Sequence, residues 1–162
     1  MTERSVIHDT FCIERTYPAS PSRVFAAFAS REAKDAWGGD PDMDPTDAHP
    51  ASNEFDFRPG GRERFSFKYE DRTFGYDALY YDIVPDQRIV YSYEMYVDSA
   101  RISVSVATIE FATSGDGTAL AWTEQGAYLD GIDGPQASVL REEGTAGMLD
   151  GLTRYLQAPP VS

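Results

Sequence analysis

Glu124 is a charged residue in a stretch of sequence that is otherwise apolar on one face. It alternates with Leu120 and Trp122, so the three side chains project from the same side of a predicted strand. A carboxylate on an apolar wall must find a partner or shift its pKa. Two interpretations stay open: Glu124 lies at a solvated strand end, or it lines a pocket and makes a polar contact there.

Arg141 presents the same problem on a predicted C-terminal helix. It falls within the apolar sector of that helix, between Met148 and Leu152 in angle, and Leu140 lies in the same sector. The stem of Arg141 can pack while its guanidinium reaches water. The alternative is a cation in a pocket, where Arg141 can partner Glu124 if the helix crosses that strand end.

Metal chemistry has weak support in the sequence. Asp40, Asp42 and Asp44 resemble the start of a calcium loop, but Pro45 and Ala51 stand where an EF-hand needs glycine and glutamate. A zinc site needs several well-spaced ligands. We therefore expect no metal site.

The sequence also lacks the usual motifs of hydrolases and nucleotide-binding proteins. His8 and His49 are the two histidines, and no GxSxG elbow accompanies either of them. No GxGxxG or GxxxxGK[ST] motif occurs, so we expect no cofactor. The single cysteine, Cys12, is interpreted as a small buried hydrophobic residue.

Composition limits the classes of partner. The chain of 162 residues carries 14 basic and 27 acidic residues, a net charge of −13. Such a surface repels phosphate backbones and anionic lipids, so we expect no nucleic-acid and no membrane partner. The N-terminus lacks the pattern of a signal peptide, and we expect a cytoplasmic protein.

The order of predicted elements indicates an α+β fold. A strand at 6–17 is followed by two short helices that begin after Ser20 and Ser30, then by a long loop at 38–54. Period-two alternation from 55 to 128 predicts a meander of about six strands, and residues 136–157 form a long helix. Ile102, Val104 and Val106 share one parity, whereas Ile109 and Phe111 share the other, which predicts either a β-bulge near Ala107 or a break between strands.

These elements must assemble around one core. Consecutive hairpins imply an antiparallel sheet, and the long helix is the element large enough to cover one of its faces. Gly144, Gly147 and Gly151 flank the apolar sector of the helix, and they either allow close packing or leave space for a ligand. An exposed strand edge could pair two copies in a homodimer.

Several motifs together resemble the family of activators of heat-shock-protein-90 ATPase homologues, part of the START-like (SRPBCC) helix-grip superfamily. The motifs are ASPSRVF at 19–25, Trp37, FRPGG at 57–61, IVP at 83–85, Gly117-Thr118 and Glu143-Gly144. The resemblance covers about residues 8–157, so we expect one START-like domain over 1–162. It implies a curved antiparallel sheet of about six to seven strands wrapped around the C-terminal helix, with a cavity between them.

The resemblance implies binding of a small hydrophobic or aromatic molecule in that cavity. The candidate ligand-binding residues are aromatic and aliphatic wall residues plus two polar ones: Phe65, Phe67, Tyr76, Tyr93, Trp122, Met148, Leu152, Glu124 and Arg141. The resemblance supplies no catalytic residue. A cyclase-, aromatase- or hydrolase-like enzyme with Glu124 as acid or base, and a chaperone-regulating interaction module, remain alternatives.

Overall fold

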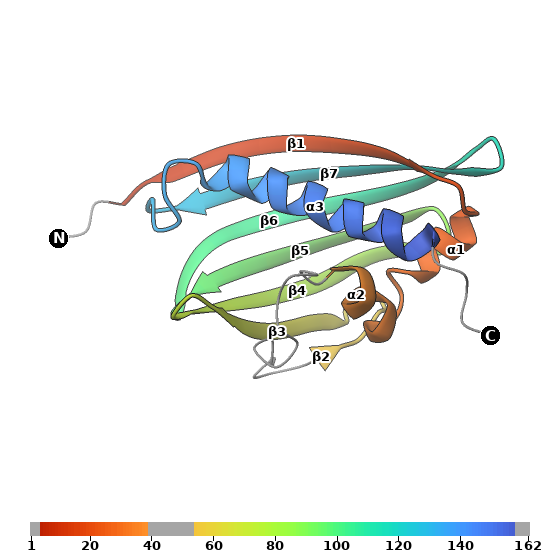
Figure 1. The fold of residues 1–162 in the computed structure, drawn as a ribbon. Coiled ribbons are helices and arrows are strands. Elements are labelled where there is room, and N and C mark those ends of the chain that lie inside the picture. Colours follow the sequence, from red (N-terminus) through yellow and green to blue (C-terminus); the bar gives the residue numbers. More distant parts are fainter. Residues whose placement is uncertain (1–3, 39–53, 158–162) are drawn as a thin grey trace.

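A single antiparallel sheet and one long helix dominate the computed structural model, which describes residues 4–38 and 54–157 (Figure 1). The strands in these ranges are β1 (Val6–Tyr17), β2 (Glu54–Phe55), β3 (Arg62–Tyr69), β4 (Arg72–Val84), β5 (Arg88–Val97), β6 (Ala100–Ser114) and β7 (Gly117–Leu129). The helices are α1 (Pro21–Ala26), α2 (Arg31–Gly38) and α3 (Ala137–Gln157). The predicted α+β class and helix-grip architecture are confirmed.

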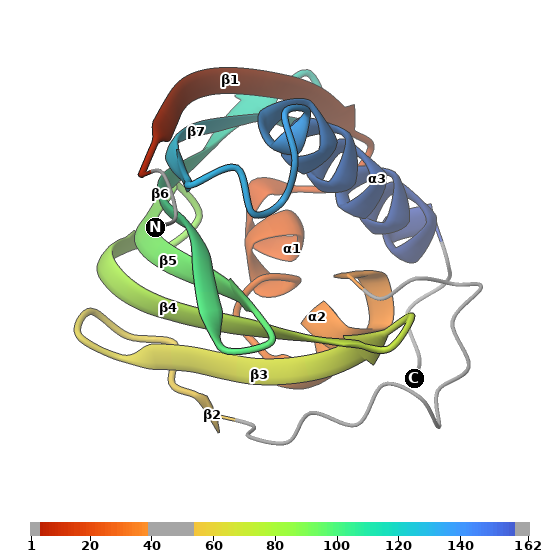
Figure 2. The same ribbon diagram turned by 90° about the vertical axis from the view of Figure 1, so that its left-hand side faces the viewer.

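The described strands form one seven-stranded sheet in the order β1-β7-β6-β5-β4-β3-β2. Each hairpin neighbour pairs with the next, and β1 joins β7 at one edge. Figure 2 shows the sheet curving from β1, beside α3, to β3 on the far side, with α1 and α2 in the hollow of the curve. The two short helices therefore close one end of the concave side.

The starts of the short helices follow from their capping residues. The Ser20 hydroxyl accepts a hydrogen bond from the backbone of Arg23 at 3.2 Å, and Pro21 begins α1. The Ser30 hydroxyl does the same for Ala33 at 3.2 Å. Both predicted helix starts are confirmed.

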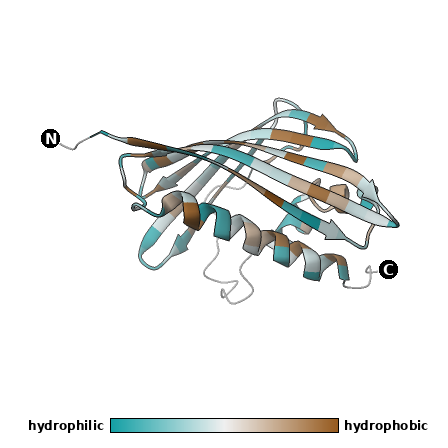
Figure 3. Cartoon of the chain, turned by 90° about the horizontal axis from the view of Figure 1, so that it is seen from above, coloured by the Kyte–Doolittle hydropathy of each residue, from teal (hydrophilic) through white to brown (hydrophobic). Residues whose placement is uncertain are grey.

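The inner face of the sheet follows a period-two pattern of burial. Figure 3 shows hydrophobic and hydrophilic segments interspersed along the strands. On β5, Ile89, Tyr91 and Tyr93 are buried. The pairing register places Ala107 opposite Tyr91 and opposite Glu124, on the same inner face. Inward residues of β5, β6 and β7 therefore meet in rows across the sheet.

The bulge predicted near Ala107 is wrong in position. The register between β5 and β6 slips instead between Met95 and Tyr96, where Ile102 is the extra residue. From Ser103 onward β6 pairs regularly, so Ser103 and Ser105 face inward while Val104 and Val106 are exposed. The predicted position was wrong because the hydrophobic valines were assigned to the inner face of β6, whereas the small serines occupy those inner positions.

Helix α3 packs through its C-terminal half. Leu149, Leu152 and Leu156 are buried, and the Tyr17 hydroxyl donates to the carbonyl of Leu149 at 3.2 Å. Leu140, expected on the apolar face, is 54% exposed, which corrects that expectation. In the first turn of α3, Val139 and Leu140 are exposed whereas Ala137 is buried, so only one side of this part of the helix is covered.

The glycines of α3 have two different environments. Gly151 lies against the end of α2, where a Cβ would collide with the carbonyl oxygen of Trp37. Gly144 and Gly147 are exposed, and a Cβ on either would meet no described atom within 4 Å. Close packing therefore explains Gly151 alone.

Cys12 is exposed, contrary to the prediction of a buried hydrophobic residue. It has the parity of Glu14 rather than that of Phe11 and Ile13, so it projects from the outer face of β1. Asp40, Asp42, Asp44 and His49, with most of the predicted loop, lie outside the described residues. None of the described helices combines the length and apolarity needed to cross a bilayer.

Candidate functional site

Glu124 lies at the centre of the inner face of β7, and 1% of it is exposed. Its Oε2 accepts a hydrogen bond from the Tyr93 hydroxyl at 2.7 Å, and its Oε1 accepts one from the Trp122 indole at 3.3 Å. The structure therefore places Glu124 in the interior with a donor on each oxygen, rather than at a solvated strand end.

Arg141 reaches the same cluster from α3. Its Nη1 donates to the Tyr93 hydroxyl oxygen at 2.9 Å, and its Nη2 donates to Ser103 Oγ at 2.9 Å. The guanidinium carbon lies 5.5 Å from the ring centre of Tyr93 and 5.4 Å from that of Tyr128, within range of cation–π attraction. The guanidinium is thus held against the sheet by these groups, and Arg141 as a whole is partly exposed.

These contacts form a directed chain from Arg141 through Tyr93 to Glu124. Arginine only donates, so the Tyr93 oxygen accepts from it and the Tyr93 proton points to Glu124. Such chains polarise one another and strengthen each bond. We call Arg141, Tyr93, Glu124, Trp122 and Ser103 the polar cluster.

Burial controls protonation within the polar cluster. Burial raises the pKa of Glu124 above 4.5, while the Tyr93 hydrogen bond, the charge of Arg141 and the Trp122 hydrogen bond oppose the rise. Burial also raises the pKa of Tyr93 well above its usual range, although Arg141 opposes it. Tyr93 therefore stays a neutral phenol and keeps its donor proton.

A row of stacked aromatic rings extends from the polar cluster across three strands. Tyr93 on β5 lies 5.1 Å from Tyr76 on β4, with 27° between ring planes. Tyr76 lies 4.8 Å from its cross-strand partner Phe65 on β3, and Phe65 lies 6.3 Å from Phe67. Tyr76, Phe65 and Phe67 are each partly exposed. We call these four residues the aromatic row.

The remaining predicted wall residues lie in or against the core. Trp122 is buried, and its ring centre is 6.3 Å from those of Phe28 and Tyr91. Leu152 is fully buried, and Met148 is partly buried against the same core. The structure thus unites Tyr93, Trp122, Glu124 and Arg141 by hydrogen bonds and joins Phe65, Phe67 and Tyr76 to them by ring contacts.

A second buried carboxylate, Glu63 on β3, was missed at the sequence level. Its Oε2 accepts from Lys34 Nζ at 2.7 Å and from the Tyr80 hydroxyl at 2.8 Å. Glu63 shares its parity with Phe65 and Phe67, which is the same signal that identified Glu124. The pair with Lys34 ties α2 to the sheet.

The floor beside Tyr93 is made of small residues. Ser105 pairs with Tyr93 on one side and with Gly126 on the other. Among the described residues, Ser105 Oγ is the buried side-chain polar atom that lacks a hydrogen-bond partner. A Cβ at Gly126 would come within 2.9 Å of that oxygen and 3.2 Å of the Tyr128 ring, so glycine is what lets both pack here.

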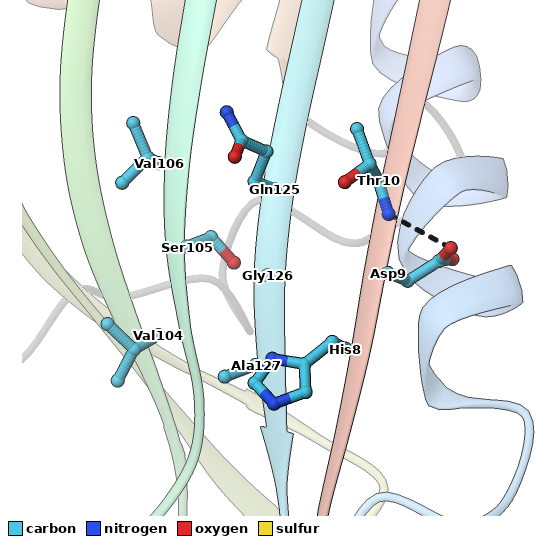
Figure 4. A pocket seen from close by; sticks show the side chains of 9 residues that line it. All are labelled: His8, Asp9, Thr10, Val104, Ser105, Val106, Gln125, Gly126 and Ala127. Atoms are coloured by element: carbon cyan, nitrogen blue, oxygen red, sulfur yellow. Dashed lines mark hydrogen bonds between the residues drawn. The ribbon is translucent and has the colours of Figure 1, made fainter.

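Two open hollows formed by described residues lie away from the aromatic row. One, with a volume of about 260 Å³, is on the outer face of β1, β6 and β7 around His8, Val104, Val106 and Gln125 (Figure 4). The other, of about 320 Å³, is bordered by Cys12 and Glu14 of β1 and by Glu142 of α3. Within the described ranges, no three His, Cys, Asp or Glu side chains gather as metal ligands do.

The comparisons with known proteins give the family. The model of the family described as "Activator of Hsp90 ATPase homolog 1-like protein" matches residues 18–157. The chain belongs to this family. The matched stretch contains every residue of the polar cluster and of the aromatic row. The START-like (SRPBCC) fold of this Hsp90-activator-homologue family is that of a ligand-binding domain.

Solved structures of similar proteins agree with this assignment. The chain is 47% identical to the Mll3558 protein of Rhizobium loti, over 93% of this chain and 99% of that one, with a TM-score of 0.80. It is 39% identical to a protein of Rhizobium leguminosarum, over 96% and 99% of the two chains, with a TM-score of 0.84. No curated protein matches this family member.

Proposed function

We propose that this protein binds a small, largely apolar aromatic molecule between the concave side of the sheet and α3. The observation that carries the proposal is the aromatic row, in which the partly exposed rings of Phe65, Phe67 and Tyr76 lead to the buried polar cluster. Binding sites for small molecules usually combine apolar walls with a few fixed polar groups. The row would supply the wall and Arg141 the polar contact.

The energy of binding would come from covering the exposed rings. Removing apolar surface from water contributes about 25 cal/mol per Å², from which the cost of ordering the ligand is subtracted. Phe65, Phe67 and Tyr76 stand beside one another, so a flat ligand could cover all three at once. Phe65 and Tyr76 already stack on each other, so a flat ligand lying across the row would meet ring edges. Such edge-to-face contacts favour aromatic over purely aliphatic ligands.

Native mass spectrometry of protein purified from its own host tests the proposal. We expect a bound species that organic extraction releases as a small molecule. Phe65→Ala should lose the species, whereas Tyr81→Ala, at a residue 59% exposed, should keep it. A ligand-free native protein, or a bound species unaffected by Phe65→Ala, would contradict the proposal.

An enzymatic role of the cyclase, aromatase or hydrolase kind is a second candidate. It is favoured by the buried carboxylate of Glu124, whose pKa is raised by burial. Both of its oxygens already accept hydrogen bonds, so a substrate would have to displace Tyr93 or Trp122 to reach it. Loss of turnover in Glu124→Gln with ligand affinity retained would support this candidate.

A further inference from the structure

Resting on the proposed function, we propose a chemical class for the polar end of the ligand. The group that meets Arg141 is a neutral hydrogen-bond acceptor, such as a ketone or amide carbonyl, and the site discriminates against carboxylates. An arginine next to an aromatic wall would ordinarily suggest an acidic ligand, so the inference depends on what already surrounds Arg141.

Arg141 has donors left for a ligand. A guanidinium carries five N–H groups, and the described structure uses one for Tyr93 and one for Ser103. The two rings beside it and these two bonds fix the plane of the guanidinium. A ligand oxygen at the end of the aromatic row could therefore accept from a positioned donor.

The positive charge of Arg141 is already balanced. Trp122 and Tyr93 each present a proton to a different oxygen of Glu124, which is the arrangement that suits an ionised carboxylate. That carboxylate lies one phenol oxygen away from the guanidinium. A ligand carboxylate at Arg141 would meet a neutral pair rather than an uncompensated cation.

Other charges near the site also disfavour a ligand carboxylate. Lys34 is paired with Glu63 at 2.7 Å, so it is not a free cation for the ligand. Asp9 and Asp133 lie close enough to Tyr128 to help raise its pKa, although burial is the main cause. The whole chain carries a net charge of −13. Like charges repel more strongly where little water screens them, so a second anion is disfavoured.

Two probes of matched shape test the inference: 2-acetylnaphthalene, a neutral ketone, and 2-naphthoate, a carboxylate with the same rings. Isothermal titration calorimetry at neutral pH and low salt gives both dissociation constants. We expect the ketone to bind the wild-type protein at least about tenfold more tightly, which corresponds to about 1.4 kcal/mol. Phe65→Ala should weaken both probes, because both would use the aromatic row.

Glu124→Gln tests the cause of the preference. Removing the balancing charge should improve binding of the naphthoate, so that the preference for the ketone shrinks or reverses. Glu110→Gln removes the same charge from an exposed position on β6 and should leave the preference unchanged. If circular dichroism shows that Glu124→Gln is unfolded, the comparison of the two probes on the wild-type protein still tests the neutral-acceptor inference.

The outcomes separate this inference from the proposed function. Equal or tighter binding of the naphthoate by the wild-type protein overturns the neutral-acceptor inference but leaves ligand binding intact. Binding of either probe that ignores Phe65→Ala, or no binding up to a concentration of about 1 mM, overturns both. A ketone preference that Glu124→Gln fails to change refutes the role given to Glu124.

Discussion

Tyr93 is the residue on which the polar cluster depends. Its hydroxyl accepts from Arg141 and donates to Glu124, so one oxygen connects a cation on α3 with a carboxylate on β7. Tyr93 is also the first ring of the aromatic row. A change at this residue therefore affects packing between the helix and the sheet as well as any ligand.

Tyr93→Phe should destabilise the protein by about 1–3 kcal/mol, because a buried carboxylate oxygen loses its donor. The free energy of unfolding measured in urea checks this value. Tyr81→Phe, which removes a hydroxyl from an exposed ring, should change stability little. Equal effects of the two substitutions would mean that the hydrogen bond to Glu124 contributes nothing.

Glu124 should make stability fall as pH rises through its titration. Its pKa is raised above 4.5 in the folded state, so the folded protein holds the proton more tightly than the unfolded chain. The slope of unfolding free energy with pH is then negative between the usual value and the raised one. Relative to Glu124→Gln, the wild type should gain stability as pH falls through this window.

Asp130 provides a comparison of opposite sign. Hydrogen bonds from the backbone of Ser5 and from the side chain of Arg4 lower the pKa of its carboxyl below 3.8. Its stabilising contribution is present above 3.8 and is lost as pH falls towards the lowered value. The advantage of wild type over Asp130→Asn should therefore shrink in acid. The same trend with pH in both variants would refute the assignment for Glu124.

At the scale of elements, α3 combines one tight contact with an exposed flank. Gly151 touches the end of α2, while Gly147 is exposed. An interior helical glycine costs about 1 kcal/mol of stability relative to alanine. At Gly151 the close contact with α2 explains why glycine is present, whereas at Gly147 no contact with a described residue offsets this cost.

Gly147→Ala should stabilise the protein by about 0.5–1 kcal/mol, through the higher helix propensity of alanine. Gly151→Ala should destabilise it by about 1–3 kcal/mol, because the new methyl group meets the Trp37 carbonyl. Thermal and urea unfolding measure both changes. Destabilisation by Gly147→Ala would indicate that this flank has a contact of its own.

The sequence was informative where local signals determine structure. Ser20 with Pro21, and Ser30, cap short helices through contacts a few residues away, and these are visible in the sequence. The position of the β-bulge was not predictable, because it depends on register with a neighbouring strand. Ile102 was therefore assigned to regular alternation when it is the extra residue.

The residues of the candidate site were also predictable from the sequence only in part. Glu124 and Arg141 were conspicuous because each breaks an apolar pattern. Their connection through Tyr93 depends on where α3 lies against the sheet, which no local pattern specifies. Glu63 broke the pattern of β3 equally, but its partner Lys34 comes from a helix whose docking could not be foreseen.

At the scale of the whole molecule, excess negative charge opposes folding. The chain contains 27 acidic residues and 14 basic ones. Several exposed ion pairs, such as Arg88 with Asp82 at 2.6 Å, offset part of the repulsion. Exposed pairs contribute about 0–1 kcal/mol each, so general repulsion should outweigh them.

The melting temperature should therefore rise as sodium chloride increases from low to physiological concentration, since salt screens the repulsion. Differential scanning calorimetry measures the change. A variant with several exposed acidic residues replaced by their amides should respond less. A fall in melting temperature with salt would mean that the ion pairs, rather than net repulsion, dominate.

The outward position of Cys12 on β1 has a practical consequence. It is the sole thiol in the chain, and it projects from the side of the sheet opposite the polar cluster. A maleimide dye or a surface tether could be attached at this one point without engineering another cysteine. Single-molecule measurements or immobilised ligand screening could thus begin with the natural protein, with the concave side unobstructed.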